Sequence, residues 1–414
     1  LALSRGPGGA EVNGLILNAA KSAKGRIPTV NLLNVISLRE INGGLELALS
    51  KLDDKDVEVV KAAWGVVGIM GTPALIPDLL ARCEDLPKDL EPFAETALVN
   101  IIQRADNTDT AAAPVLNAYL SGLGKENYLA LLVRVLGQSG AKGAFEQLSR
   151  AIQSGKVEVR RAAIAALALW PSSDPLEMLA NRFETEEDAA ARVMILRAAV
   201  PLVMQPGGKS QEELLEQVMR FAAAAKDRRE KDQAATVISR VDTPAAVEAL
   251  ESMAAAEPER ASSLGSLAGR MKEVLDKVCT ASNGAITLSA DRAAFAPGRV
   301  QARDNVLFGW SANGDWAAWL AKVETPGRYS IQINQSQADG DPLVYDVYFA
   351  GEKLTTRSVV TGGDGAQSGA PFKAFEVGTV NVPKAGHYRV ILRLRQVPPG
   401  AGELQIRELT LKAQ

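Results

Sequence analysis

Over roughly the first two thirds of the chain, apolar residues recur every three or four positions, which is the spacing of one helix face. In the segment Asp56–Asp85, the apolar positions from Val59 to Met70 follow this spacing before Gly71 interrupts it. Similar segments follow at spacings of 33, 38, 29, 32 and 42 residues from Val57 onward, beginning near Leu90, Tyr128, Val157, Ala189 and Lys231. A loose period of this length is typical of stacked helix pairs that bury one continuous core.

The segment that begins at Val157 shows the unit most clearly, as VEVRRAAIAALALWPSSDPLEMLANRFE. It contains an amphipathic helix, a turn with Pro and Asp, and a second amphipathic helix. This unit resembles the HEAT repeat, including its short PBS-lyase-like form, and the resemblance covers most of residues 12–278. It implies an α-α superhelix, a HEAT-like solenoid whose surface holds a protein partner. We expect Trp170, at the end of the first helix, to pack between adjacent repeats.

Beyond Ser282-Asn283-Gly284 the apolar period changes from about 3.6 to 2. In His387–Gln396, apolar side chains alternate with arginines, so that one strand face is apolar and the other is charged. Seven further strands are predicted at 286–288, 316–323, 329–333, 343–349, 354–360, 375–382 and 404–411. This number of short strands fits an antiparallel sandwich or jelly roll. The predicted fold class is therefore a multidomain α and β protein, with a helical domain at 1–280 and a β-sandwich at 284–414.

Several motifs of the second part occur in a familiar order: AITLSADRA, GDWAAWLAKVETPGRYSIQI, VVTGGDG, GTVNVPKAGHYRVILRLR and LQIRELTLKA. In this order they resemble the galactose-binding-like jelly rolls, especially the carbohydrate-binding modules of families 6 and 35, over about residues 285–412. The resemblance implies carbohydrate binding and a place outside the cytoplasm, in the periplasm or at the cell surface. The chain departs from the family where an acidic residue often serves a structural calcium, because Gln405 and Arg407 stand there.

Trp310, Trp316 and Trp319 lie within ten residues of one another. Sugars offer C–H faces that stack on aromatic rings, and their hydroxyls need polar partners nearby. Residues 316 and 319 point to opposite faces of a strand, and we assign Trp319 to the core with Ala317, Ala321 and Val323. Trp316 or Trp310 is then the candidate stacking platform, with Asn313 and Asp315 as polar partners. The alternative is that all three rings are buried.

Two further groups of polar residues are candidate sites. Asp339, Asp341 and Asp364 lie on Gly-rich loops, where carboxylates bind calcium or simply form turns. Calcium is the only cofactor that the sequence suggests. Arg389, Arg393 and Arg395 share one strand face, which would fit an acidic glycan or an acidic protein partner, or remain solvated.

The composition excludes several classes of function. Lys and Arg number 46 and Asp and Glu 49, so the formal net charge of −3 argues against nucleic-acid binding. His387 is the single histidine, which leaves no multi-histidine metal site. The Gly207–Ser210 segment lacks a phosphate-loop context and is predicted to be a turn between helices. Cys83 and Cys279 are predicted to be buried on helices. No apolar run reaches the roughly 18 to 20 residues of a membrane span. We expect no catalytic site.

Three functions remain open at this point. The first is a non-enzymatic binding or scaffold protein, in which the solenoid holds a protein and the sandwich a carbohydrate. The second is a structural subunit of a larger cell-envelope complex. The third is an accessory fragment of a longer exported enzyme, of the kind found in long bacterial chains, whose catalytic or haem domain is absent. The first residue is Leu rather than Met, so we expect a processed or partial chain.

Overall fold

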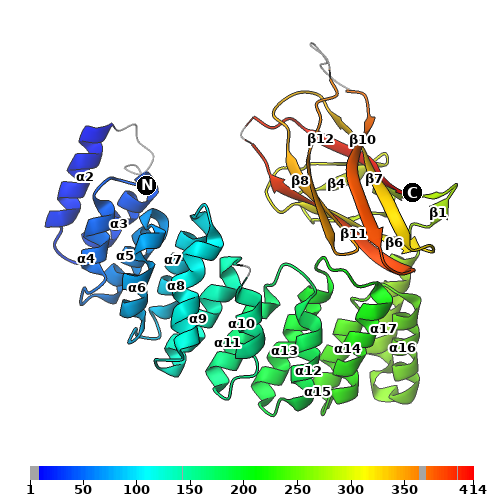
Figure 1. The fold of residues 1–414 in the computed structure, drawn as a ribbon, viewed down its shortest axis with the longest axis horizontal. Helices are drawn as coiled ribbons and strands as arrows, with labels where there is room; N and C mark the ends of the chain where they lie inside the picture. The colour runs from blue at the N-terminus through cyan, green and yellow to red at the C-terminus, as the bar shows by residue number, and fades with distance from the viewer. Residues whose placement is uncertain (1–8, 142, 363–369, 399) are drawn as a thin grey trace. The chain divides into compact units, whose positions relative to one another are not determined.

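The structure of the protein is a computed structural model that describes residues 9–141, 143–362, 370–398 and 400–414 (Figure 1). Within these residues, sixteen α-helices, labelled α2 to α17, precede two antiparallel β-sheets. The predicted fold class, an all-helical region followed by an antiparallel sandwich, is confirmed. The HEAT-type repeat itself stays a prediction.

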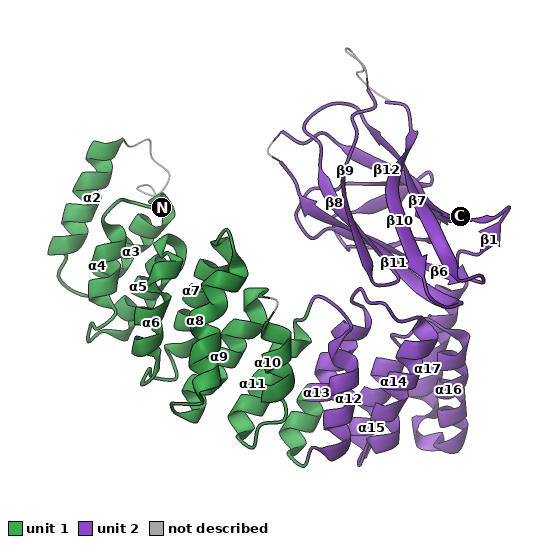
Figure 2. Ribbon diagram, in the orientation of Figure 1, with its two compact units in different colours: residues 1–170, 187–194 green, residues 171–186, 195–414 purple. Residues whose placement is uncertain are grey.

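The chain divides into two compact units, and their boundary lies well before the change from helix to strand (Figure 2). Unit 1 comprises residues 1–170 and 187–194, and unit 2 comprises residues 171–186 and 195–414. The last helices are therefore grouped with the β-sandwich in unit 2, while the change from helix to strand lies near residue 280.

Unit 1 is built of helices in which alternate members pack on one another: α3 on α5, α5 on α7, α7 on α9 and α9 on α11. Small residues allow two of these contacts to be close. A methyl group at Gly68 would lie 3.0 Å from the Ala97 Cα, and one at Gly137 only 2.3 Å from the Ala166 Cβ. The helices are α2 (Ala10–Ser22), α3 (Arg26–Arg39), α4 (Gly44–Lys51), α5 (Val57–Met70), α6 (Ile76–Cys83), α7 (Glu91–Arg104), α8 (Thr108–Ser121), α9 (Glu126–Ser139), α10 (Ala144–Ala151) and α11 (Val157–Ala168).

Trp170 packs on a neighbouring helix but is not fully buried. It lies just after α11, is half-buried, and packs on Phe145 at a ring-centroid distance of 5.1 Å. Its neighbour Leu169 is 70% exposed. The apolar period of α11 ends before these two residues, because the helix itself stops at Ala168.

Unit 2 contains the remaining helices, except that α13 begins in unit 1. Gly207–Ser210 forms a turn between two helices, as predicted. Ser210 begins α14 in a capping box with Glu213, in which each side chain accepts a hydrogen bond from the other residue's backbone N–H. The helices are α12 (Pro175–Thr185), α13 (Ala189–Val203), α14 (Gln211–Ala224), α15 (Arg228–Ile238), α16 (Pro244–Ala256) and α17 (Ala261–Leu275).

The sandwich consists of two sheets in which every strand pair is antiparallel. Sheet A has the order β3-β6-β11-β8-β9; in sheet B, β12 pairs with β2, β5 and β7, while β10, β1 and β4 extend its edges. The strands of sheet A are β3 (Ala294–Phe295), β6 (Trp316–Val323), β8 (Val344–Phe349), β9 (Glu352–Arg357) and β11 (Gly386–Gln396). Those of sheet B are β1 (Ala281–Ser282), β2 (Ala285–Ser289), β4 (Gln301–Arg303), β5 (Val306–Phe308), β7 (Gly327–Gln337), β10 (Lys373–Val382) and β12 (Leu404–Ala413).

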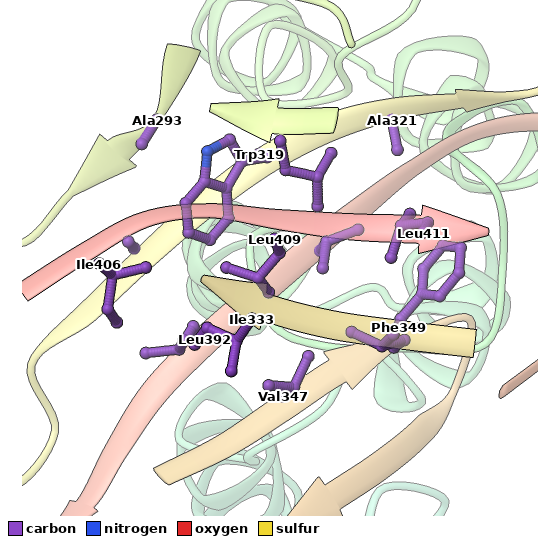
Figure 3. Packing of buried hydrophobic residues seen from close by; sticks show 14 of the residues in the cluster. Ala293, Trp319, Ala321, Ile333, Val347, Phe349, Leu392, Ile406, Leu409 and Leu411 are labelled. Atoms are coloured by element: carbon purple, nitrogen blue, oxygen red, sulfur yellow. The ribbon is translucent and has the colours of Figure 1, made fainter. Parts of the chain in front are cut away.

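Apolar side chains of both sheets meet in one core (Figure 3). Trp319 lies there with Ala317, Ala321 and Val323, as the alternation predicted. The indole N–H of Trp319 donates to the Ser289 carbonyl at 2.8 Å, which satisfies its polar atom. The sequence missed the four shortest strands, β1, β3, β4 and β5, because two or three residues carry no period.

Cys279 is buried, as predicted, but it does not lie on a helix. It follows α17 and forms an isolated β-bridge to Ala321 of β6. Its backbone N–H donates to the Leu320 carbonyl at 2.8 Å, and its carbonyl accepts from Lys322 N–H at 2.9 Å. The chain therefore passes from the last helix to β6 of sheet A by backbone pairing, with the Cys279 side chain in the sandwich core.

Candidate ligand pocket between the last helices and sheet A

Within unit 2, Arg389 of β11 attaches sheet A to the helices. The guanidinium of Arg389 donates to the backbone carbonyls of Val203 at 3.0 Å and Arg240 at 3.2 Å, and it pairs with the Asp242 carboxylate. The Arg389 and Asp242 side chains are only 9% and 15% exposed. A buried arginine must have all its donors occupied to be tolerated, so these three partners fix the sheet against the ends of α13 and α15.

A second set of contacts lies at the start of α14. Glu212 accepts hydrogen bonds from the backbone N–H of His387 at 3.0 Å and from its Nδ1 at 2.6 Å. Lys384 pairs with Glu213 at 2.5 Å. Burial opposes ionisation of Glu212, but the hydrogen bonds from the His387 side chain and from backbone N–H groups outweigh it and lower the pKa of Glu212 to about 2.

Between these helix ends and sheet A lies a cavity of about 610 Å³, here called the helix–sheet pocket. This volume falls within the usual range of small-molecule sites. One wall is sheet A, where Trp316, Ala318 and Leu320 point outward from alternate positions of β6. Trp316 is half-buried, and the small Ala318 beside it leaves room over the strand.

The opposite wall is one face of α17. Leu267, Arg270, Met271 and Val274 recur at helical spacing and line the pocket together. Val274 is 43% exposed and Met204, near the end of α13, is 39% exposed. Large apolar side chains that remain exposed beside a cavity provide a surface on which a ligand gains contact.

Polar groups complete the lining. Thr236 and Ser239, at the end of α15, provide hydroxyls, and Arg389 provides its guanidinium. The charged residues are Arg240, Asp242, Arg270, Glu273, Lys277, Arg292 and Arg389. Cations therefore outnumber acids around the pocket, although the whole chain carries a net charge of −3.

The structure places only one of the four predicted carbohydrate-site residues at this pocket, namely Trp316. Trp310 is not a surface platform, because its ring is 6% exposed and packs in the sandwich core. Trp310 follows Gly309 in a loop, where no strand alternation predicts the direction of its side chain.

Asp315 and Asn313 hold the loop before β6 in shape. Asp315 is 1% exposed and accepts from the backbone N–H groups of Ser311 and Ala312, both at 2.9 Å, and from Arg299 at 3.2 Å. Its carboxylate is thus occupied, which corrects its assignment as a sugar ligand. Asn313 is exposed and accepts from Val397 N–H at 3.0 Å.

Of the three candidate metal residues, the structure describes two. Asp339 and Asp341 are exposed on the loop between β7 and β8, where their backbone carbonyls accept from Gln337 Nε2 at 3.0 and 3.1 Å. Asp364 lies outside the described residues. Among the described residues, no group of three or more His, Cys, Asp and Glu is placed to hold a metal ion.

The predicted partner face is largely used within unit 2. Arg389 is covered by the helices, so it is not available to a separate partner. Arg393 donates to Gln205 at 3.3 Å and lies 5.8 Å from the Tyr348 ring centroid. Arg395 alone of the three is fully exposed. The alternation on β11 was predicted correctly, but local pattern does not show that helices cover the charged face.

The sequence analysis missed the α17 wall altogether. Its signal was present, since Leu267, Met271 and Val274 share a face, but the same spacing describes any core-facing helix. What distinguishes this face is that Arg270 and Lys277 lie at its edges.

The chain was compared with family models, curated proteins and solved structures. No family model matches the chain, and no curated protein matches it. Several solved structures match part of the chain. One is a family 35 carbohydrate-binding module from Clostridium thermocellum, with 11% sequence identity and a TM-score of 0.26; the match covers 32% of this chain and 100% of that module. Another is the C-terminal family 6 module of a laminarinase from Zobellia galactanivorans, with 18% sequence identity and a TM-score of 0.24; the match covers 31% of this chain and 98% of that module. A third is a mannanase with a family 35 module from Podospora anserina, with 16% sequence identity and a TM-score of 0.25; the match covers 32% of this chain and 28% of the mannanase.

The matches cover about a third of this chain, and the chain spans only 28% of the mannanase. Among the described residues, no helix is long and apolar enough to cross a membrane.

Proposed function

We propose that the protein is a non-enzymatic carbohydrate-binding protein that acts outside the cytoplasm, and that Trp316 is the stacking platform. The observation that carries this proposal is the position of Trp316: half-buried, on the outer face of sheet A, and lining a cavity of about 610 Å³. Aromatic rings that are neither covered nor free in solvent are suited to stack on the C–H face of a sugar.

The polar groups around the ring fit the second need of a sugar, which is hydrogen bonding for its hydroxyls. Thr236 and Ser239 provide hydroxyl oxygens that can accept hydrogen bonds, since their protons already donate to helix carbonyls at 3.0 and 2.8 Å. Arg270 provides fixed donors. The apolar side chains of Met204 and Val274 complete a surface that contains both polar and apolar groups.

The same lining argues against sugar hydrolysis. Most glycosidases need two carboxyl groups, one on each side of the bond that breaks. The two acids of the helix–sheet pocket are Asp242 and Glu273, and Asp242 is already paired with Arg389. Glu273 alone does not make an acid and base pair, so binding is the function we propose.

The HEAT-type solenoid and its protein partner form the second part of the proposal. Two close contacts of unit 1, Gly68 with Ala97 and Gly137 with Ala166, each join residues 29 positions apart. A recurring contact at a constant separation supports a structural repeat. Such repeats present an extended surface, which in other solenoids binds proteins.

The test is calorimetry of the whole chain with neutral, uronic and sulfated oligosaccharides. Trp316→Ala is expected to abolish measurable binding while the thermal unfolding temperature stays close to that of the wild type. Phe372→Ala is the matched control: Phe372 is also half-buried, but it lies just before β10 of sheet B, where Arg407 packs on it at 4.1 Å. Absence of binding across the panel at millimolar ligand, with the protein folded, would refute the proposal.

A further inference from the structure

Three cations around the helix–sheet pocket differ from paired cations nearby in the chain. Arg260, Lys231 and Lys272 do not line the pocket and are paired, with partners at 2.7, 3.2 and 2.6 Å: Asp232, Glu257 and Glu251 respectively. Within the described part of the chain, the side chains of Arg240, Arg270 and Lys277 have no such partner. Among the described residues, these three cations of the pocket lining are therefore not neutralised by an ion pair.

The acids of the pocket do not compensate for this charge. Asp242 is held by Arg389, so these two residues cancel one another. Glu273 then stands against Arg240, Arg270, Lys277 and Arg292. Arg292 is anchored in part, because it donates to the Val278 carbonyl at 2.6 Å.

The position of these charges strengthens their effect on a ligand. Arg270 lies on α17 and Lys277 follows the end of that helix, and both line the pocket with Val274. Apolar walls such as Met271 and Leu320 lower the local dielectric, so the field of the rim is focused into the cavity. Guanidinium groups bind carboxylate and sulfate oxygens through paired hydrogen bonds.

We infer that the helices of unit 2 make the pocket selective for saccharides that carry an anionic group, a carboxylate or a sulfate, which Arg240, Arg270 and Lys277 bind. This inference rests on the proposed carbohydrate function and adds the class of sugar. Sheet A provides the platform, Trp316, and the helices recognise the charge. Neither part contains the complete site, so the ligand contacts both.

The experiment compares three probes on the whole chain: an oligogalacturonate, its carboxyl-reduced neutral counterpart and a sulfated galactose oligosaccharide. At least one anionic probe is expected to bind about tenfold or more tightly than the neutral one, because a charge-assisted hydrogen bond is roughly twice as strong as a neutral one. Raising the salt concentration should weaken the binding of the anionic probe alone. The anionic probe that binds identifies whether carboxylate or sulfate is the natural group.

Arg270→Gln combined with Lys277→Gln is expected to remove the preference, so that the anionic probes bind no more tightly than the neutral one. Lys272→Gln is the control, since Lys272 lies on the same helix, is exposed, and pairs with Glu251 away from the pocket. If all three probes bind equally, or if the double variant keeps the preference, the inference is overturned while the carbohydrate function stands. If no probe binds, the proposed function fails as well.

Discussion

The carboxylate of Glu212, in the first turn of α14, receives two hydrogen bonds from His387 on β11, 175 residues later in the chain. One comes from the backbone N–H and the other from the imidazole Nδ1, at 3.0 and 2.6 Å. An ionised carboxylate can only accept, so Nδ1 carries the proton. The one histidine of the protein thus attaches the sandwich to the helices.

This contact predicts a specific acid sensitivity. The pKa of Glu212 is lowered from 4.5 to about 2 in the folded protein. A carboxyl group whose folded pKa is depressed stabilises the fold above its unfolded pKa, and that contribution is lost as the pH falls from about 4.5 toward 2. Glu212→Gln should therefore unfold more easily at pH 6 and lose less further stability between pH 4.5 and 2.5 than the wild type. Urea denaturation at several pH values tests this, and parallel pH profiles of the two proteins would contradict it.

The two faces of β6 predict opposite phenotypes for two tryptophans three residues apart. Trp319 is 2% exposed and fills the sandwich core, so Trp319→Ala should cost about 3 to 5 kcal/mol of unfolding free energy. Trp316→Ala should cost less than about 1 kcal/mol, because the ring faces a cavity rather than close-packed atoms. Chemical denaturation followed by far-UV circular dichroism separates the two. Equal losses would show that Trp316 belongs to the core.

A glycine in unit 1 is required by close helix packing. A methyl group at Gly137 would lie 2.3 Å from the Ala166 Cβ, so Gly137→Ala should force α9 and α11 apart and cost about 1 to 3 kcal/mol. Gly65→Ala is the control, since Gly65 lies within α5 with no atom within 4 Å of the added methyl. There the better helix propensity of Ala should stabilise the protein by up to about 1 kcal/mol. Thermal unfolding of both variants measures the difference, and a neutral Gly137→Ala would contradict the close contact.

The ion pairs of unit 1 should contribute differently to the free energy of unfolding, according to how deeply each pair is buried. Arg134 of α9 pairs with Glu91 and Glu95 of α7 at 2.8 and 2.7 Å, and the Glu91 side chain is 10% exposed. Arg134→Ala leaves a buried carboxylate without its partner and should cost about 1 to 3 kcal/mol.

The matched control for this ion pair is Lys125→Ala. Lys125 and Asp85 are 76% and 78% exposed, and exposed pairs contribute about 0 to 1 kcal/mol. Urea midpoints measured in low and high salt compare the two pairs. If Lys125→Ala lost as much unfolding free energy as Arg134→Ala, burial would not determine how much an ion pair contributes to stability.

The sequence by itself determined the order of helices and strands and the direction of side chains within each regular element. The placing of Trp319 in the core and the alternation on β11 followed from a period of two, and the turn at Gly207–Ser210 followed from the helices on either side. These features depend on neighbours within a few residues, and local sterics and apolar spacing fix them.

The tertiary structure alone decided what covers each face. The arginines of β11 were correctly placed on the outer face, but only folding brings Arg389 onto the Val203 carbonyl, 186 residues away, and onto Asp242, 147 residues away. The helix–sheet pocket likewise combines Trp316 of β6 with Arg270 of α17. Periodicity along one element defines a face but contains no information about the partner surface, which depends on how distant segments pack to bury their apolar area.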